Sequence, residues 1–160
     1  MKTESRAAYL IRHLHMQPHP EGGYYAEHFR SQQLVELTNG SPRSAVTSIY
    51  YLLQRNEISR LHVVDADEIW HWHEGDELEL WLANPELTEL KIICLAQPGP
   101  DAQPSAVVPA GWYQAVRSRG AYTLCGCTVA PAFQFSGFRF LLGDEPEKLQ
   151  ALNPDAAAFC

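Results

Sequence analysis

The sequence predicts an all-β fold of the sandwich or barrel type. Turn signals rich in glycine, proline, asparagine and aspartate recur about every 8–12 residues between residues 22 and 142. The runs between these turns are short and rich in β-branched and aromatic residues, as in VTSIYYLL at 46–53. No long helical pattern separates them, which argues against alternating βαβ units. The pattern is typical of short strands joined by tight turns.

One helix is expected at each end of the barrel. The first covers about residues 4–15, where Leu10, Ile11 and Leu14 recur at helical spacing, and the second covers about residues 145–152. The strands are expected at 24–30, 46–53, 68–73, 78–82, 90–95, 107–108, 121–129 and 133–141. The barrel then spans about 22–142, and residues 1–160 form a single domain.

Composition excludes several classes of protein. A chain with 46% hydrophobic and 19% charged residues is not disordered. A net charge of −7 without a basic run argues against nucleic acid or an anionic membrane surface as partner. No apolar run approaches the ~18 residues needed to span a bilayer, and the N-terminus does not resemble a signal peptide. The sequence therefore predicts a cytoplasmic protein, whose four cysteines form no CxxC pair and are expected to be free thiols.

Two clusters of residues carry a resemblance to a known family. The first runs from His62 through Glu68 to Gly75, and the second is VPAGWYQAV at 108–116. Together they resemble the two cupin motifs: a His, then a Glu and a Gly, and later a PxG turn followed by a polar residue. The resemblance extends over about residues 8–145 to the cupin-5 group (domain of unknown function 985), through HPEGGYYAEHFRS at 19–31, SIYYLL at 48–53, DEIWHWHEGDELEL at 67–80 and FSGFRF at 135–140. It implies a double-stranded β-helix, the cupin jelly-roll barrel, which is usually a homodimer with a ligand or metal in its mouth.

The resemblance also implies a candidate metal site. Metal-binding cupins use two His and a Glu from the first motif and a His from the second. His62 and Glu68 match two of these positions, whereas Arg60 stands at the first His and Gln114 at the last. Arginine and glutamine rarely bind transition metals. The sequence therefore names no certain cofactor, and a divalent metal ion at His62, Glu68 and Gln114 is the candidate.

A second alignment of the first motif is open. His71, His73 and Glu77 also satisfy His-x-His-x-x-x-Glu, and alternate strand residues share a face, so the two imidazoles could converge on an ion. Glu68 and Trp70 then lie on the opposite face, and both sets cannot face one interior without a bulge. The spacing to the following glycine favours the first alignment. In that alignment His71 and His73 face the other side of the sheet, toward a dimer partner or neighbouring hydrogen bonds.

A second family resemblance bears on chemistry. EGGYYAEHFR at 21–30 is similar to the opening strand of the dTDP-4-dehydrorhamnose 3,5-epimerases, and so are Leu61-His62 and Cys127-Thr128. In those enzymes the first segment helps bind a nucleotide sugar, and the His is a general base, whose position His62 occupies. Neutral imidazole suits proton abstraction near pH 7. The Asp and Tyr that follow Cys-Thr in the epimerases are replaced here by VAP at 129–131, so the same epimerisation is not expected.

The remaining candidates would line a pocket for a small ligand. An apolar cavity with a few polar groups is the ordinary form of such a site, and aromatic faces with an arginine fork suit a sugar, a nucleotide or a carboxylate. The candidate ligand-binding residues are Tyr24, Arg30, Tyr50, Arg60, Glu68, Trp70 and Gln114. Tyr113 or Tyr24 is the candidate acid. Alternatively, Trp70 fills the barrel core, and Arg60 with Glu68 forms a structural ion pair.

Three functions remain open at this point. The first is a dimeric protein that binds a small polar or sugar-like metabolite and isomerises or epimerises it with His62 as base. The second is a metal-dependent cupin enzyme, such as a dioxygenase or lyase, and the third is a binding module without catalysis. The fold alone does not choose among them, because cupin barrels serve all three roles. The expected partners are a small molecule and a second copy of the chain, with no nucleic acid and no membrane.

Overall fold

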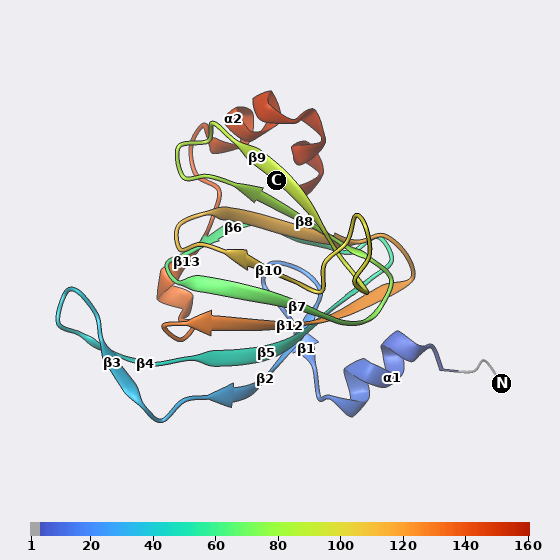
Figure 1. Ribbon diagram of the computed structural model, residues 1–160, viewed down its shortest axis with the longest axis horizontal. Helices are drawn as coiled ribbons and strands as arrows, with labels where there is room; N and C mark the ends of the chain where they lie inside the picture. Colours follow the sequence, from blue (N-terminus) through green and yellow to red (C-terminus); the bar gives the residue numbers. More distant parts are fainter. Residues whose placement is uncertain (1–3) are drawn as a thin grey trace.

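The computed structural model describes residues 4–160, so residues 1–3 of the expected domain lie outside the described part. Two antiparallel sheets face each other and enclose the barrel interior (Figure 1). The first sheet has the order β1 (Gln17–Pro18), β2 (Tyr24–Arg30), β5 (Thr47–Gln54), β12 (Tyr122–Ala130), β7 (Asp67–Gly75) and β10 (Ser105–Val108). The second has the order β13 (Phe138–Phe140), β6 (Ile58–Val64), β11 (Tyr113–Ser118), β8 (Leu78–Ala83) and β9 (Leu90–Leu95). The predicted all-β barrel with short terminal helices is confirmed.

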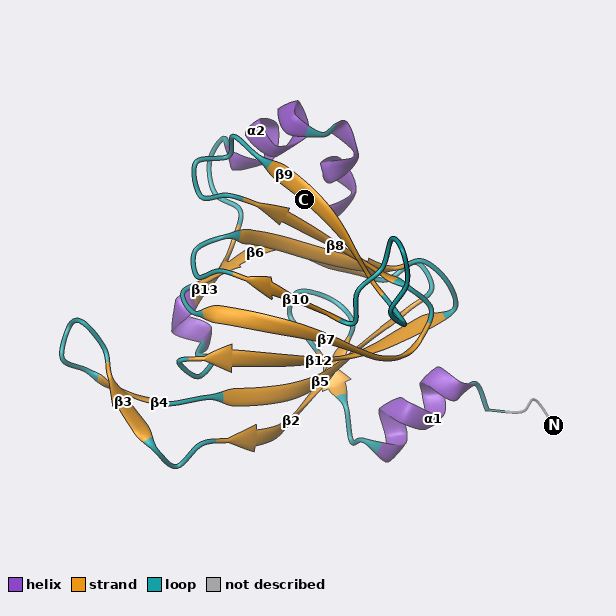
Figure 2. Cartoon of the chain, in the orientation of Figure 1, coloured by secondary structure: helices purple, strands orange, loops and turns teal. Residues whose placement is uncertain are grey.

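The smaller elements lie outside the two sheets. β3 (Leu34–Glu36) and β4 (Pro42–Ser44) form a hairpin that projects from the barrel (Figure 1). The helices are α1 (Arg6–His13), η1 (Phe135–Gly137), α2 (Glu145–Leu152) and η2 (Pro154–Phe159), and Figure 2 shows them at the periphery of the strands. Within the described chain, no helix is long and apolar enough to cross a membrane. The four cysteines are free thiols, as expected.

The main hydrophobic core lies between the two sheets. Strand alternation sends every second side chain inward, so that Tyr51 and Leu53 of β5, Trp70 of β7 and Leu80 of β8 meet there with less than 2% exposure. Smaller cores lie under the helices. α1 buries Leu10 against the outer face of the first sheet, and α2 with η2 covers the outer face of the second. The inter-sheet core fills one part of the barrel and leaves the other end hollow.

One bulge in β6 decides which of its side chains face the interior. β6 pairs with β11 through His62 opposite Gln114 and Ser59 opposite Val116, so β6 has one extra residue between these two pairs. Because the extra residue breaks the alternation, Ser59 and His62 face the same side. Leu61 instead packs in the core beneath α2 and η2, and Arg60 is exposed.

Candidate functional site

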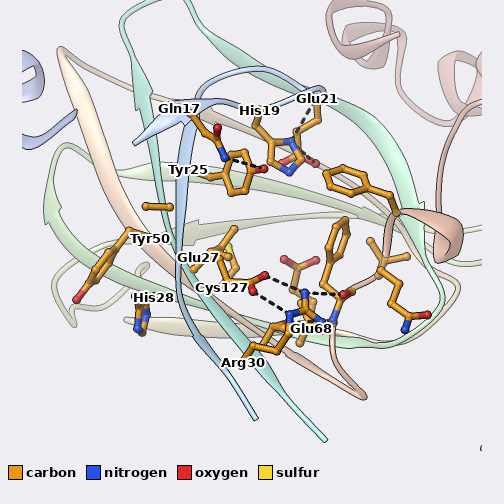
Figure 3. A pocket seen from close by; sticks show the side chains of 18 of the residues that line it. Gln17, His19, Glu21, Tyr25, Glu27, His28, Arg30, Tyr50, Glu68 and Cys127 are labelled. Carbon is orange, nitrogen blue, oxygen red and sulfur yellow. Dashed lines mark hydrogen bonds and ion pairs between the residues drawn. The ribbon is translucent and has the colours of Figure 1, made fainter. Parts of the chain in front are cut away.

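A cavity of about 770 Å³ opens at the end of the barrel where β5 and β7 begin and β6 and β12 end (Figure 3). Its walls combine aromatic and aliphatic side chains with many titratable groups. The titratable groups that line it are His15, His19, Glu21, Tyr25, Glu27, His28, Arg30, Tyr50, His62, Glu68 and Cys127. Of these, Glu21, His62, Glu68 and Cys127 are buried. Buried titratable side chains that line a cavity often belong to a functional site.

His62 and Glu21 face each other in close contact inside the cavity. Nε2 of His62 lies 3.0 Å from Oε2 of Glu21, and Nδ1 lies 2.6 Å from the carbonyl oxygen of Arg60. A carbonyl oxygen only accepts, so Nδ1 carries a proton and donates it to Arg60. Burial raises the pKa of Glu21 to about 8 and lowers the pKa of His62. At neutral pH the shared proton therefore resides on Glu21, which donates it to Nε2.

Glu21 reaches the interior because two glycines follow it. Gly22 and Gly23 have φ angles of 115° and 69°, a region that L side chains rarely adopt. A Cβ on Gly22 would collide with the carbonyl oxygen of Ile58. The turn is fixed by Tyr51, whose hydroxyl donates to the Gly22 carbonyl at 2.6 Å. This close approach of the β1–β2 connection to β6 brings Glu21 to His62.

His19 adds a second imidazole to the same connection. Its Nδ1 accepts a hydrogen bond from the backbone N–H of Glu21 at 3.2 Å, which leaves Nε2 as the protonated nitrogen of the neutral ring. Burial, with a smaller contribution from His62, lowers its pKa to about 4. Its ring meets that of Tyr25 edge-on at a centroid distance of 4.7 Å, close to the carboxyl of Glu21 (Figure 3). His19 is thus a neutral hydrogen-bond donor at neutral pH.

Glu68 is held by a chain of two hydrogen bonds that starts in the core. The indole N–H of Trp70 donates to Oε1 of Gln114 at 2.8 Å, and Nε2 of Gln114 donates to Oε2 of Glu68 at 2.6 Å. Indole N–H is only a donor, so it forces the carbonyl of Gln114 toward Trp70 and the amide NH₂ toward Glu68. Burial, with the nearby Glu21 as a second cause, raises the pKa of Glu68 to about 7. The carboxyl therefore changes its charge near neutral pH.

The outer part of the cavity carries a closed ion pair. Arg30 binds both carboxylate oxygens of Glu27, at 2.8 and 2.9 Å, and also donates to the Phe133 carbonyl at 3.1 Å (Figure 3). Phe133 and Phe135 add aromatic surface beside it. The arginine charge is thus already compensated by Glu27.

The structure separates three predicted site residues, Arg60, Tyr24 and Tyr113, from the cavity. Arg60 is exposed and stacks its guanidinium over Phe140 at 4.4 Å, because the β6 bulge turns it outward. Its expected position beside His62 and Glu68 is therefore corrected. Tyr24 packs with the core beneath α1, and Tyr113 donates to Glu145 at 2.6 Å under α2.

Three other predicted residues have less direct roles. Trp70 is 1% exposed and fills the core, and Gln114 lies behind Glu68 rather than at the cavity surface. Tyr50 lines the outer part of the cavity, where it stacks on His28 at 4.4 Å. Four of the predicted residues line one cavity: Arg30, Tyr50, His62 and Glu68. Gln114 does not line it but is hydrogen-bonded to Glu68, which does.

The faces of β7 settle which alignment of the first motif lies inside. Glu68 and Trp70 point inward, whereas His71 and His73 lie on the outer face of the first sheet. Nε2 of His71 is 3.5 Å from the hydroxyl of Thr128, and His73 lies over Gly126, where a Cβ would meet its Nε2 at 2.6 Å. The barrel interior therefore follows the alignment with His62 and Glu68.

The candidate metal ligands do not fit an ion. Both polar atoms of the Gln114 amide are engaged by Trp70 and Glu68, and Nε2 of His62 faces Glu21. Of the three ligands that the cupin resemblance implies, Glu68 is then the one that remains available. A single carboxylate is too few ligands for a transition metal. Within residues 4–160, no three His, Cys, Asp or Glu side chains are arranged to hold a metal ion.

Sequence reasoning missed part of the cluster. His19, Glu21 and Tyr25 belong to segments that resemble the cupin-5 group or the epimerases, but none of them was among the candidate site residues. The signal was present, because a glycine pair next to polar and aromatic residues indicates a close approach of the backbone. Nothing in the sequence showed that this segment folds toward β6.

The fold and cavity together define a cupin barrel. The chain belongs to the family described as Cupin superfamily (DUF985), whose model matches residues 8–141. A hypothetical protein from Leishmania major is similar at a TM-score of 0.82 and 28% identity, over 97% of both chains. A protein from Shewanella oneidensis is similar at a TM-score of 0.82 and 30% identity, over 97% of this chain and 94% of that one.

More distant structures share the fold alone. Oxalate decarboxylase from Bacillus subtilis has a TM-score of 0.58 at 14% identity, over 78% of this chain and 29% of the decarboxylase. A cupin 2 conserved barrel domain protein from Rhodopseudomonas palustris has the same TM-score and identity, over 89% and 83% of the two chains. No curated protein matches the chain in sequence.

Proposed function

We propose that this protein binds a small, neutral, sugar-like metabolite in the cavity and isomerises or epimerises it by proton transfer next to a carbonyl group. The observation that carries the proposal is the confinement of two carboxyl groups and two imidazoles, Glu21, Glu68, His19 and His62, in one cavity of about 770 Å³. This volume lies within the usual range for small-molecule sites.

The charges of the cavity favour a neutral ligand. Arg30 is compensated by Glu27, and Glu68 is ionised in part at neutral pH, so an anionic ligand would meet repulsion, and no uncompensated Lys or Arg lies among the described residues that line the cavity. Carboxyl and imidazole groups are good partners for hydroxyl groups. Tyr25 and Phe135 supply the apolar surface against which a sugar ring can pack.

The protonation states favour acid–base chemistry. An isomerase of this type needs one group that accepts a proton and another that donates one, with pKa values near the working pH. Glu68, with a pKa of about 7, and the proton shared by Glu21 and His62 supply both. The two carboxyl groups differ in their neighbours, and such differences let similar groups take opposite roles. His62, the base expected from the sequence, acts here together with Glu21.

The proposal is tested with a panel of free aldoses and ketoses and, for comparison, their phosphate esters. Binding is measured by isothermal titration calorimetry, and proton transfer by the loss of the α-proton NMR signal in D₂O. We expect a free sugar to bind and exchange its α-proton faster than in buffer, and its phosphate ester to bind more weakly. Binding without exchange would identify a non-catalytic binding module. Absence of binding by every free sugar would contradict the proposal.

A further inference from the structure

We propose that Glu68 is the catalytic residue that takes the proton from the ligand, and that Trp70, acting through Gln114, is a positioning residue that keeps this carboxyl able to accept it. The inference rests on the proposed function and assigns its central step. Glu68 lines the cavity, and its carboxyl accepts a hydrogen bond from Gln114 at Oε2 and a weaker one from the thiol of Cys127.

His62 is less well placed for the same task. Both of its ring nitrogens are engaged, Nδ1 with the Arg60 carbonyl and Nε2 with Glu21, and the residue is 2% exposed. A direct attack on a ligand proton would first break the bond to Glu21. Glu68 is less firmly engaged, because its one strong hydrogen bond is accepted at Oε2 from Gln114 and its second partner is the thiol of Cys127, a weak donor.

The proposed step is balanced in protons and electrons. The carboxylate of Glu68 takes the proton bonded to the carbon next to the carbonyl group, and the electron pair of that C–H bond forms a C=C bond. The carbonyl π pair moves to oxygen, which receives the proton of the Glu21–His62 pair. In an isomerisation, Glu68 returns the proton to the former carbonyl carbon, and the neighbouring hydroxyl group gives its proton back to the Glu21–His62 pair as the new C=O bond forms. In an epimerisation, the intermediate first turns its other face to Glu68, which returns the proton to the same carbon, and the enol hydroxyl gives its proton back to the Glu21–His62 pair as the original C=O bond re-forms. No oxidant or reductant is needed.

Trp70 acts on Glu68 by fixing the orientation of the Gln114 side-chain amide. Because indole N–H only donates, it holds the amide carbonyl and leaves the NH₂ to face Glu68, where it stabilises the ionised carboxylate. Without the indole N–H, the amide can rotate and present its carbonyl to Glu68, which stabilises the protonated acid. The other titratable groups that face Glu68 are Glu21 and His62, together with the thiol of Cys127.

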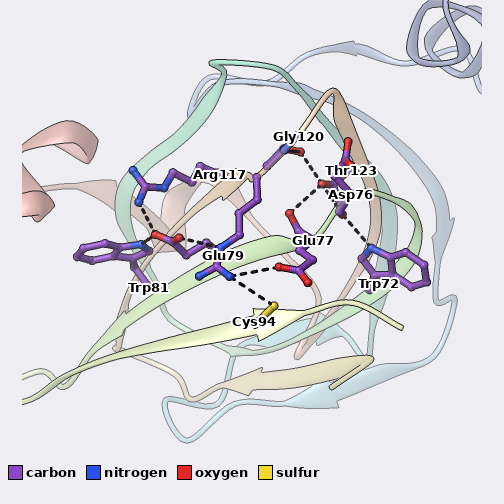
Figure 4. Close-up of polar contacts among 11 residues, drawn as sticks. Trp72, Asp76, Glu77, Glu79, Trp81, Cys94, Arg117, Gly120 and Thr123 are labelled. Carbon is purple, nitrogen blue, oxygen red and sulfur yellow. Dashed lines mark hydrogen bonds and ion pairs between the residues drawn. The ribbon is translucent and has the colours of Figure 1, made fainter. Parts of the chain in front are cut away.

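The first test compares Glu68→Gln with Glu79→Gln. Glu79 is also buried, but it binds Arg117, Arg119 and Trp81 away from the cavity (Figure 4). The probes are dihydroxyacetone, D-xylulose and D-fructose in D₂O, with α-proton exchange followed by NMR. We expect Glu68→Gln to lower exchange roughly 10²- to 10⁴-fold, the usual contribution of a general base, without loss of binding. Glu79→Gln should exchange as the wild type does.

The outcomes separate this inference from the proposed function. Exchange at the wild-type rate in Glu68→Gln would overturn the assignment of Glu68, while the proposed function would stand with another base. Absence of exchange of all three probes by the wild type would overturn the catalytic part of both, and calorimetry would show whether binding survives.

The second test measures the pH profile of exchange in Trp70→Phe, with Trp81→Phe as control. Trp81 is equally buried, and its indole N–H binds Glu79 (Figure 4). We expect the rising limb of the Trp70→Phe profile to move up by roughly one pH unit, because the turned amide favours protonated Glu68. Gln114→Met should move it in the same direction if Trp70→Phe fails to fold. A profile unchanged in both variants would overturn the positioning role.

Discussion

The Nε2 atom of His62 lies 3.0 Å from the carboxyl of Glu21, and both side chains are more than nine-tenths buried. The pair joins β6 to the β1–β2 connection, two segments with no other ionic contact in the described chain. Burial keeps it neutral by placing the shared proton on the carboxyl group. The stability of this fold should therefore depend on pH near neutrality.

We expect the free energy of unfolding to fall as the pH rises from 6.5 to 8. In this window Glu21, with a pKa of about 8, keeps its proton in the folded chain, whereas the unfolded carboxyl, with a pKa of 4.5, has lost it. Unfolding then releases a proton and is favoured by high pH, by at most about 1.4 kcal/mol per pH unit for each proton. Glu68 acts in the same direction up to about pH 7. His19 and His62 act in the opposite direction only below 6.5, where the unfolded imidazoles bind protons.

Urea denaturation at several pH values checks this expectation. Glu21→Gln should make the dependence between pH 6.5 and 8 less steep. Glu145→Gln is the control: burial would raise the pKa of Glu145, but bonds from Arg139 and Tyr113 outweigh it and lower the pKa to about 2, outside the window. An equal slope in wild type and Glu21→Gln would show that Glu21 is ionised in the folded protein.

Gly22→Ala should destabilise the protein by roughly 2–3 kcal/mol, because it combines an unfavourable φ angle with a collision against Ile58. Gly40→Ala separates these two effects. Gly40 also has a positive φ angle, of 81°, but no atom lies within 4 Å of the position that an alanine methyl group would take there. Thermal denaturation of both variants measures the difference, and equal losses would show that the close approach to β6 does not matter.

Phe159→Ala should lower the free energy of unfolding by about 3–5 kcal/mol. Phe159 is fully buried and packs against Trp81 at a centroid distance of 5.1 Å, so its removal leaves a cavity beneath η2. Phe29→Ala is the matched control, since Phe29 is 51% exposed and its loss should change stability by less than about 1 kcal/mol. Chemical denaturation tests both variants, and a small effect at Phe159 would mean that the C-terminal segment is not part of the cooperative fold.

Elemental analysis of the purified protein should find no stoichiometric iron, manganese, nickel or zinc. The reason is that Gln114 and His62 direct their polar atoms toward Trp70, Glu68 and Glu21 instead of a common point. Treatment with EDTA should accordingly leave the melting temperature unchanged. One equivalent of metal that disappears in His62→Ala would contradict this interpretation of the cluster.

The strands that alternate regularly could be predicted from the sequence. VTSIYYLL became β5, and the expected segment 90–95 became β9, because β-branched and aromatic residues repeat there without interruption. β6 was not predicted, although it holds His62. Its extra residue breaks the period of two, so ISRLHVV does not show the alternation of an ordinary strand. The expected strand at 133–141 shortens to Phe138–Phe140, because the turn of η1 takes up the residues before it.

The candidate site could also be predicted only in part, again because of the bulge in β6. The cupin motifs identified His62 and Glu68, and both line the cavity. The same motif placed Arg60 beside them, at the position of its first His, but the bulge in β6 turns Arg60 outward. The contribution of Glu21 depends on a contact between segments that lie far apart in the chain, and no local pattern encodes such a contact.

Because of the bulge in β6, the groups that face the interior depend on the number of residues between Ser59 and His62 as well as on their identity. If one of the two positions between Ser59 and His62 were deleted, strict alternation would return, and the side chains before the deletion would exchange sides with respect to those after it. Two relatives could thus keep every polar residue of this hollow and still differ in what their ligands meet, through the gain or loss of a single backbone unit.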